Sequence, residues 1–275
     1  LDVRELIKTN SYYRNAKVEW ALTQSKISEA IDEKALHITQ GFLGSDGNNF
    51  TTTLGREGSD YTAAIFAFCL NAKSVTIWKD VPGVLNADPR FFENPTLLDS
   101  LSYEEAIELS YYGASVIHPK TLQPLQQKEI PLYVKCFLEP KNKGTKVGKS
   151  LDLSPNVPCY ILRKDQILIT VSSLDFSYIV EENISHIFKL LHLYKMKVRS
   201  IQNSAISFSV CIENSYNHLE PLILQLKAKY NVRLDKAVDL YTIRHYTTDA
   251  IEEIQKNKTV LMKQITPKTV QIITK

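Results

Sequence analysis

The stretch "TTTLGREGSDYTAAIFA", Thr51 to Ala67, places a β-branched run directly before a glycine-flanked loop and an alanine-rich apolar segment. The run favours a strand and the apolar segment a helix, with Arg56 and Asp60 in the loop between them. A loop at a helix N-terminus presents backbone N–H groups and the positive end of the helix dipole, which suit a phosphate or carboxylate. Arg56 adds a planar, two-pronged donor. The alternative interpretation is that Ser59 and Asp60 only cap the helix.

The composition is that of an ordinary globular protein. The 275 residues leave room for one large domain or for two to three small ones, and 44% are hydrophobic. The net charge of +3 comes from 33 basic and 30 acidic residues without a basic block, which argues against a nucleic-acid-binding protein. No apolar run approaches the roughly 18 residues that a membrane span needs, so we expect neither nucleic acid nor membrane as a partner.

The four cysteines are far apart in the sequence, at Cys69, Cys136, Cys159 and Cys211. Their spacing matches neither a zinc site nor a redox pair, and each lies in an apolar context. We therefore expect buried free thiols and no metal site, in a reducing compartment such as the cytoplasm.

The first half of the chain alternates between predicted strands and helices. Strands are predicted at 35–40, 51–54, 74–83 and 131–137. Helices are predicted at 59–72, 103–114 and 120–130, the second opened by an S-x-x-E capping box at Ser102 and Glu105. Such alternation is typical of parallel pairing in a layered α/β fold.

Residues 139–158 are rich in proline, glycine and lysine, and we interpret them as a linker. Beyond them the order is βαββαβ, which is the ferredoxin-like unit. Its strands are predicted at 165–174, 197–203, 205–213 and 232–234, and its helices at 182–196 and 216–231. A second, shortened unit of similar pattern follows, with strands predicted at 237–246, 258–265 and 268–275 and a helix at 249–257.

Two further segments carry candidate chemistry. "IWKDVPGVLNADPR", residues 77–90, ends a predicted strand at Lys79 and Asp80, and ligands bind at the carboxyl ends of such strands. Lys79 and Arg90 are candidates to face nucleotide phosphates; the alternative is a solvated, charged turn. "YYGASVIHPKT", residues 111–121, places His118 at the start of a helix, where it more often forms structural hydrogen bonds than catalyses.

Together these segments resemble the second half of the aspartokinase catalytic domain. The motifs are "GFLGSDGNNFTTTLGREGSDYTAA", "IWKDVPGVLNADPR", "LSYEEAIELSYYGASVIHPKTL" and "IPLYVKCFLEPKNKGT", in the order and spacing of that family. The ferredoxin-like tandem resembles the ACT domains that follow in aspartokinases. The resemblance implies an α/β fold: a partial amino-acid-kinase domain with a layered, mostly parallel sheet at 1–147, then an ACT unit at 159–236 and a shortened one at 237–275.

The resemblance also implies an aspartate kinase. The side-chain carboxylate of L-aspartate would attack the γ-phosphate of ATP, with Mg²⁺ carried by the nucleotide, and give 4-phospho-L-aspartate for lysine, threonine and methionine biosynthesis. The implied substrate residues are Arg56, Gly58, Ser59 and Asp60, with Asp60 in the catalytic role. The implied ATP-binding residues are Lys79, Asp80, Leu85, Arg90 and Ser115. Two of these depart from the family pattern, which often has lysine at Ser115 and tyrosine at Leu85.

The lysine-glycine-glycine loop with which aspartokinases begin has no counterpart in these residues, and the sequence starts at Leu1 without methionine. We expect that the sequence is part of a longer protein or that residues 1–275 alone are inactive. Two alternatives stay open. One is a non-catalytic regulatory subunit that binds an amino-acid effector. The other is an amino-acid-kinase-fold enzyme for another substrate such as glutamate, which would not predict an ACT tandem.

In lysine-inhibited aspartokinases, acidic residues of the first ACT unit hold the lysine ammonium. Here Arg199 and Ala205 occupy the matching positions, so we expect lysine to bind weakly because Arg199 would repel it. The implied effector residues are Val198, Arg199, Ser204 and Ile206. The resemblance further implies a homodimer or larger oligomer formed through the ACT units.

Overall fold

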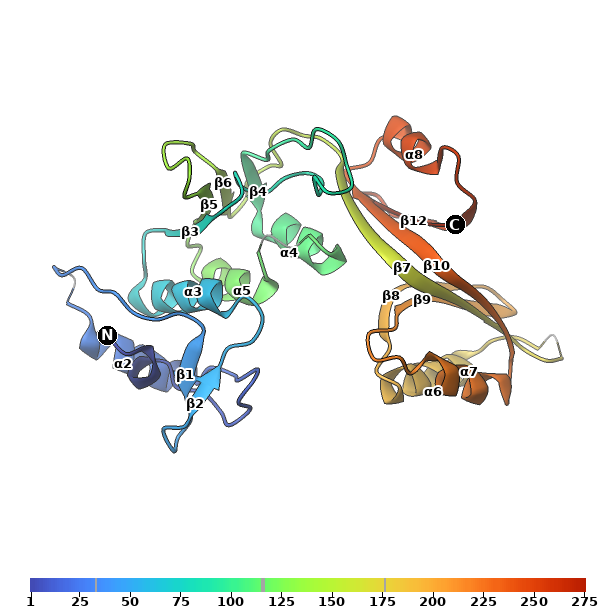
Figure 1. Cartoon of the computed structure of the whole chain (residues 1–275), viewed down its shortest axis with the longest axis horizontal. Helices are drawn as coiled ribbons and strands as arrows, with labels where there is room; N and C mark the ends of the chain where they lie inside the picture. Colours follow the sequence, from blue (N-terminus) through green and yellow to red (C-terminus); the bar gives the residue numbers. More distant parts are fainter. Residues whose placement is uncertain (33, 115–116, 176) are drawn as a thin grey trace. The chain divides into compact units, whose positions relative to one another are not determined.

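The computed structural model describes residues 1–275 except residues 33, 115–116 and 176, so that Ser115 lies outside the described residues. The chain divides into two compact units, Leu1–Val157 and Pro158–Lys275 (Figure 1). The division falls inside the segment interpreted as a linker. No helix in the described ranges is both long and apolar enough to span a bilayer.

Unit 1 begins with two helices and a short hairpin that pack beneath a longer helix. These elements are α1 (Val3–Leu6), α2 (Trp20–Ala30), β1 (Leu43–Ser45), β2 (Thr51–Thr53) and α3 (Gly58–Leu70). Val3, Ile7, Ile27, Leu54 and Ile65 are fully buried between them. The helix and strand predicted around "TTTLGREGSDYTAAIFA" are therefore confirmed.

The strand predicted at 35–40 is wrong, because β1 lies further along the chain. Leu36 and Ile38 are largely exposed and pair with no strand in the described structure. The hairpin turn selects the register instead: the buried Asp46 carboxylate accepts from the N–H groups of Asn48 and Phe50 at 3.0 and 2.9 Å. This turn aligns β2 with Leu43–Ser45.

The main sheet of unit 1 has the order β3-β5-β6-β4. Its strands are β3 (Val75–Lys79), β4 (Ser100–Ser102), β5 (Leu132–Cys136) and β6 (Thr145–Gly148), and its helices are α4 (Tyr103–Tyr112) and α5 (Pro119–Gln127). The β3–β5 and β4–β6 ladders are parallel and the β5–β6 ladder is antiparallel. Ser102 caps α4 by accepting from the Glu105 N–H at 3.1 Å, as the capping motif predicts.

Strand β6 lies within the predicted linker, which is a correction to that interpretation. Thr145, Val147 and Gly148 are buried although the surrounding segment is rich in lysine and glycine. A strand needs only its alternate side chains to be buried, so a short strand is difficult to recognise in a segment whose residues are mostly polar. Gly144 precedes it at φ 67°, and a Cβ there would lie 2.1 Å from the Val134 carbonyl oxygen.

Unit 2 begins with an antiparallel ferredoxin-like sheet in the order β10-β7-β9-β8. Its elements are β7 (Cys159–Ser172), α6 (Glu181–Leu193), β8 (Lys197–Asn203), β9 (Ser207–Glu213), α7 (Leu219–Lys227) and β10 (Asn231–Arg244). The helices cover one face, where Ile169, Val171, Ile187, Val210 and Leu222 are buried. The predicted βαββαβ order is thus confirmed.

The C-terminal elements α8 (Thr248–Gln255), β11 (Val260–Ile265) and β12 (Thr269–Thr274) extend the same sheet to β11-β12-β10-β7-β9-β8. The first residues of β7, Cys159 onward, pair with the last residues of β10. Two long strands therefore serve both halves of unit 2, as Figure 1 shows. The predicted boundary at 236/237 falls inside β10, between Asp235 and Val238, where the register with β7 shifts.

The opposite face of this sheet forms a second core. Leu168 and Cys211 pack there with Val238, Met262 and Ile273. Ser200 of β8 donates to Gln271 of β12 at 3.0 Å, so the sheet curls and its two halves approach each other. All four cysteines are buried and free, as expected, and burial raises the pKa of the Cys211 thiol to about 12.

Thr145 provides a test of the role of β6. Its buried hydroxyl accepts from the Val84 N–H at 2.8 Å and donates to the Leu98 carbonyl oxygen at 2.6 Å. We expect Thr145→Val to lower the free energy of unfolding by about 2–4 kcal/mol, because the substitution leaves a buried donor and acceptor unpaired. Urea unfolding measures this loss. The exposed Thr51→Val is the control, and equal stability of the two variants would contradict the assignment.

Candidate active site

The loop between β2 and α3 is built from tightly packed backbone. Glu57 adopts a left-handed conformation with φ 54° and precedes the first residue of α3. A Cβ on Gly58 would lie 2.5 Å from Phe42 Cδ2, so a side chain at that position would clash with Phe42. The Phe42 N–H donates to Thr62 Oγ1 at 2.9 Å and ties the hairpin to the first turns of α3. The loop therefore presents the N-terminus of α3 in one fixed geometry.

Asp60 and Lys79 meet at the centre of the candidate site. Lys79 Nζ, at the carboxyl end of β3, lies 2.7 Å from Asp60 Oδ2, in the first turn of α3, and the two side chains are 22% and 16% exposed. No donor among the described residues forms a directed hydrogen bond with Asp60 Oδ2, so the contact is an ion pair. The fold thus joins a residue predicted for the substrate side to one predicted for the nucleotide side.

Three residues close in sequence to Asp60 or Lys79 are exposed to solvent: Arg56, Ser59 and Asp80. The Arg56 side chain is 74% exposed, and its Nε lies 4.0 Å from Glu57 Oε1. Ser59 and Asp80 are also exposed. Arg56 is therefore accessible to a carboxylate or phosphate from solution, and Gly58 is buried beneath it as part of the loop backbone.

Leu85 and Arg90 lie on the turn after β3. Leu85 is half-buried and its backbone bridges Leu97. Arg90 Nη2 donates to Asp88 Oδ2 at 2.6 Å, and this hydrogen bond holds the pKa of Asp88 below its ordinary value. No contact in the described part of the chain joins Arg90 to the Asp60–Lys79 pair. The structure therefore places Arg90 in its own turn, where a phosphate would have to compete with Asp88.

Lys120 is a residue of this region that the sequence patterns did not single out. Its ammonium contacts Asn15 Oδ1 and lies 3.5 Å from the Leu54 carbonyl oxygen, directly before the Arg56 loop. The neighbouring His118 is the N-cap of α5 and accepts from the Lys120 N–H through Nδ1 at 3.2 Å. His118 thus has the structural role that is common for a lone histidine. Lys120 could have been found only by knowing that α5 packs against α3.

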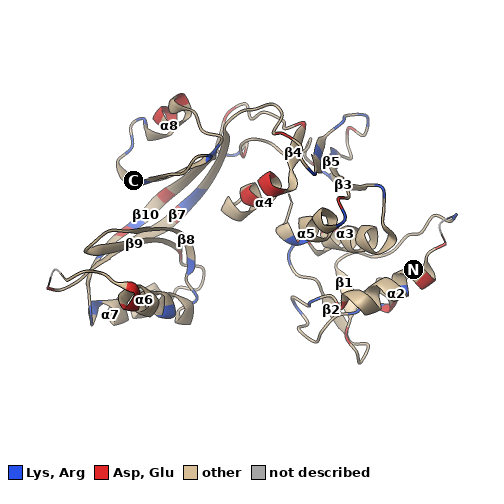
Figure 2. Cartoon of the chain, turned by 180° about the vertical axis from the view of Figure 1, so that it is seen from behind, with Lys and Arg blue, Asp and Glu red and all other residues tan. Residues whose placement is uncertain are grey.

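Charged residues of both signs are interspersed over each unit, with acidic residues gathered on α4 and α8 (Figure 2). No group of three or more His, Cys, Asp or Glu side chains within the described ranges could hold a metal ion.

The predicted effector residues fall at two places on unit 2. Ser204, Ala205 and Ile206 form the β8–β9 turn, where Ser204 Oγ lies 2.7 Å from Ser207 Oγ. Arg199 lies near the other end of β8, and its guanidinium is paired with the Glu213 carboxylate. Val198 pairs with Ile212 on β9. The strand therefore separates Arg199 from the turn.

The pairing with Glu213 corrects the expectation that Arg199 presents an uncompensated charge. Burial opposes ionisation of Glu213, but hydrogen bonds from Arg199 and Ser215 outweigh it and hold the pKa of Glu213 below its ordinary value. Glu213 is thus an acid that neutralises Arg199. Its partnership depends on strand register, which the sequence did not reveal.

Comparison with known proteins gives a consistent set of relatives. Residues 2–136 match the amino acid kinase family. The chain is 32% identical over 253 residues to the lysine-sensitive aspartokinase 3 of Escherichia coli, covering 88% of this chain and 56% of that protein. It is 31% identical over 207 residues to the chloroplastic aspartokinase 1 of Arabidopsis thaliana, covering 74% and 36%.

Among solved structures, E. coli aspartokinase III in complex with lysine and aspartate superposes with a TM-score of 0.80 at 28% identity, covering 99% of this chain and 65% of that one. The same enzyme in complex with aspartate and ADP gives 0.77 at 27% identity, covering 100% and 65%. The chain spans just over half the length of the curated E. coli relative. Residues 2–136 are thus similar to the amino acid kinase family, and most of the chain is similar in sequence and structure to the aspartokinases.

Proposed function

We propose that the protein is an aspartate kinase, which transfers the γ-phosphoryl group of ATP to the side-chain carboxylate of L-aspartate. The observation that carries the proposal is the Asp60–Lys79 ion pair at the N-terminus of α3, beside the exposed Arg56, in a segment of the amino acid kinase family. Complexes of the E. coli relative with aspartate and with ADP support the choice of substrates.

In the proposed reaction, an aspartate side-chain oxygen forms a bond to the γ-phosphorus, and the bond from that phosphorus to the bridging oxygen breaks to leave ADP. Phosphoryl transfer depends mainly on positioning and on neutralising the charge that spreads over the phosphate oxygens. Arg56 binds a carboxylate of aspartate, supported by its exposure and planar donors. The N–H groups around Gly58 and Ser59, at the start of α3, receive the transferring phosphate.

Lys79 exchanges its partner during the proposed cycle. In this structure Asp60 neutralises it; with nucleotide bound, the ammonium turns to phosphate oxygens and leaves Asp60 to organise the transferring group. The Asp60 carboxylate, whose Oδ2 has no directed donor among the described residues, has the chemistry that Mg²⁺ accepts. Mg²⁺ carried by the nucleotide would neutralise phosphate charge there. Asp80, Leu85, Arg90 and Ser115 complete the proposed ATP site.

Unit 2 is proposed to bind an amino-acid effector and to hold the protein in a homodimer or larger oligomer. The crystallised complex of the E. coli relative with lysine supports an effector of this class. A purely regulatory, non-catalytic role is less well supported, because the Arg56 loop and the Asp60–Lys79 pair lie in the kinase segment. We also propose a reducing location such as the cytoplasm, supported by four free, buried cysteines.

The role of Arg56 can be tested in the encoded protein at its full length. We expect Arg56→Ala to raise the KM for aspartate by roughly 10- to 150-fold, because a charged hydrogen bond contributes about 1.5–3 kcal/mol. The KM for ATP should change little. Steady-state kinetics measures both values, with the exposed Arg4→Ala as the control. Equal changes in the two KM values would assign Arg56 to the nucleotide or the fold.

The Asp60–Lys79 contact can be tested without any assay of activity. We expect Asp60→Asn and Lys79→Met to be destabilising singly, and the double variant to lose less stability than their sum, with a coupling of about 0.5–3 kcal/mol. Urea unfolding of the four proteins completes the cycle. Additive losses would show that the 2.7 Å ion pair does not form in solution.

The charge of the β8–β9 turn leads to a prediction about lysine. Ala205 supplies no acid, and the Glu213 carboxylate is already engaged by Arg199, so we expect lysine to inhibit the unmodified kinase weakly. Ala205→Glu should strengthen inhibition, and Thr259→Glu, an exposed change elsewhere in unit 2, should not. Rate against lysine concentration distinguishes them. Inhibition of the unmodified enzyme at micromolar lysine would contradict the electrostatic argument.

A further inference from the structure

Helix α5 contacts helix α3 near both of its ends through two lysines, and the two helices pack side by side (Figure 1). Lys128, directly after α5, donates to the Phe68 carbonyl oxygen at 2.5 Å and to Asn71 Oδ1 at 2.6 Å, where α3 ends. Lys120, in the first turn of α5, reaches the chain just before α3 begins. The two helices therefore run in the same direction, with one lysine at each end of the helix that carries Asp60.

The Lys120 ammonium contacts two oxygens at the base of the Arg56 loop. It donates to Asn15 Oδ1 and lies 3.5 Å from the Leu54 carbonyl oxygen. Asn15 in turn packs against Gly55, because a Cβ on Gly55, whose φ is 82°, would lie 2.6 Å from Asn15 Oδ1. The ammonium, the amide and the glycine thus form one continuous set of contacts that ends directly before Arg56.

The backbone around Asn15 is itself anchored to β2. The Ala16 N–H donates to the Thr53 carbonyl oxygen at 3.0 Å, and the Thr53 N–H donates to the Tyr13 carbonyl oxygen at 2.7 Å. These hydrogen bonds hold Asn15 in place independently of α5. Lys120 therefore joins the start of α5 to an anchored side chain on one side and to the loop backbone on the other.

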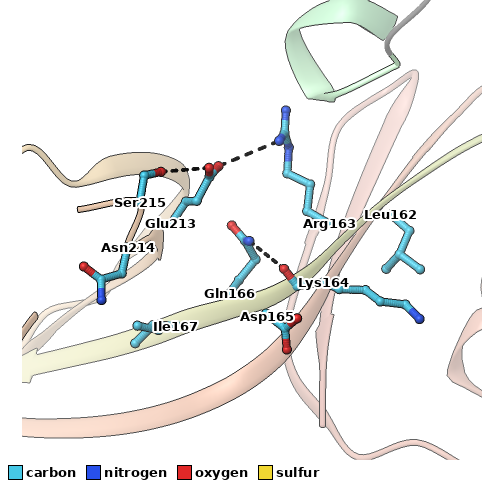
Figure 3. Close-up of a pocket in the computed structure, with 9 residues that line it drawn as sticks. All are labelled: Leu162, Arg163, Lys164, Asp165, Gln166, Ile167, Glu213, Asn214 and Ser215. Carbon is cyan, nitrogen blue, oxygen red and sulfur yellow. Dashed lines mark hydrogen bonds and ion pairs between the residues drawn. The ribbon is translucent and has the colours of Figure 1, made fainter. Parts of the chain in front are cut away.

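The contacts of Lys120 leave its positive charge in place, because both oxygens belong to neutral groups. Figure 3 shows the opposite case in unit 2, where Arg163 is directed at the Glu213 carboxylate, 3.9 Å away, and that carboxylate offsets its charge. Lys120 thus adds positive potential at the base of the loop that presents Arg56. An incoming carboxylate is attracted by both cations.

We propose that Lys120 is a positioning residue for the aspartate site. By holding Leu54 and Gly55 against Asn15, it fixes the place from which the Arg56 guanidinium meets the substrate carboxylate. The Arg56 side chain is 74% exposed, so the backbone beneath it sets its reach. A displacement of about 1 Å in such a binding group is enough to weaken a reaction strongly. The proposal rests on the proposed kinase function and adds a residue to its aspartate site.

The kinetic test uses the encoded protein at its full length. Lys120→Met keeps an unbranched side chain but removes the ammonium. We expect the KM for aspartate to rise by about fivefold or more, and kcat and the KM for ATP to change by less than about twofold, because only the carboxylate site is displaced. Asn15→Ala, a milder change that keeps Lys120, should give the same rise, and the double variant no further rise, because both changes break one set of contacts.

Lys128→Met is the matched control, because it breaks contacts of the same kind at the other end of α3. It should leave the KM for aspartate unchanged. Urea unfolding of each variant shows that it is folded under the conditions of the assay.

Hydrogen exchange followed by mass spectrometry tests the positioning without any assay of activity. We expect Lys120→Met to raise the exchange rates of the amides at 54–60 by about fivefold or more and to leave those at 68–72 unchanged. Lys128→Met should do the reverse. Opposite local effects of two lysines on one helix would show that each holds its own end of α3.

Three results would overturn the proposal. The first is unchanged exchange at 54–60 in a folded Lys120→Met protein. The second is an unchanged KM for aspartate in that variant and in Asn15→Ala. The third is an equal rise of this KM in Lys128→Met, which would make the effect one of α3 as a whole. Failure of the proposed function gives a different result: the unmodified full-length protein would not phosphorylate aspartate, and exchange at 54–60 would still report whether Lys120 holds the loop.

Discussion

The candidate active site depends on one ion pair, between Lys79 at the carboxyl end of β3 and Asp60 at the start of α3. Both side chains are mostly buried, so an isolated charge on either would carry a desolvation penalty that its partner offsets. The pair therefore constrains the end of the strand and the start of the helix to stay together. The pair also keeps the Lys79 cation beside the start of α3, so that in the proposed cycle it has only to exchange Asp60 for a phosphate.

Backbone packing maintains this arrangement from the other side. Gly58 packs so closely against Phe42 that the hairpin and the helix cannot separate without breaking this contact. The hydrogen bond from the Phe42 N–H to Thr62 also holds the two elements together. Lys120 reaches the same loop from α5 through Asn15 and the Leu54 carbonyl. Three elements thus hold the loop while the Arg56 side chain stays exposed. A closely packed loop with one exposed cation is suited to capturing a small anionic substrate.

The local pattern predicted most elements of this chain, because capping at Ser102, the β-branched run at Thr51–Thr53 and the ferredoxin-like order of unit 2 are local signals. The failures concern pairing between distant segments. The segment around strand β6 is too polar for the strand to be recognised without β5 and β4. Residues 35–40 alternate like a strand but join no strand in the part of the chain that the structure describes. The sharing of β7 and β10 between two halves is likewise a property of register, which a one-dimensional pattern does not contain.

The same limit applies to charge. In the sequence, Arg199 is an isolated cation in a strand, 14 positions from Glu213; in the fold, the β8–β9 register brings the two together. Charge counted along the chain therefore misstates the electrostatic field that a ligand meets, because the opposite charges of an ion pair largely cancel at a distance. The charge that a ligand of unit 2 meets therefore depends on which strands pair, and not on the order of charged residues along the sequence.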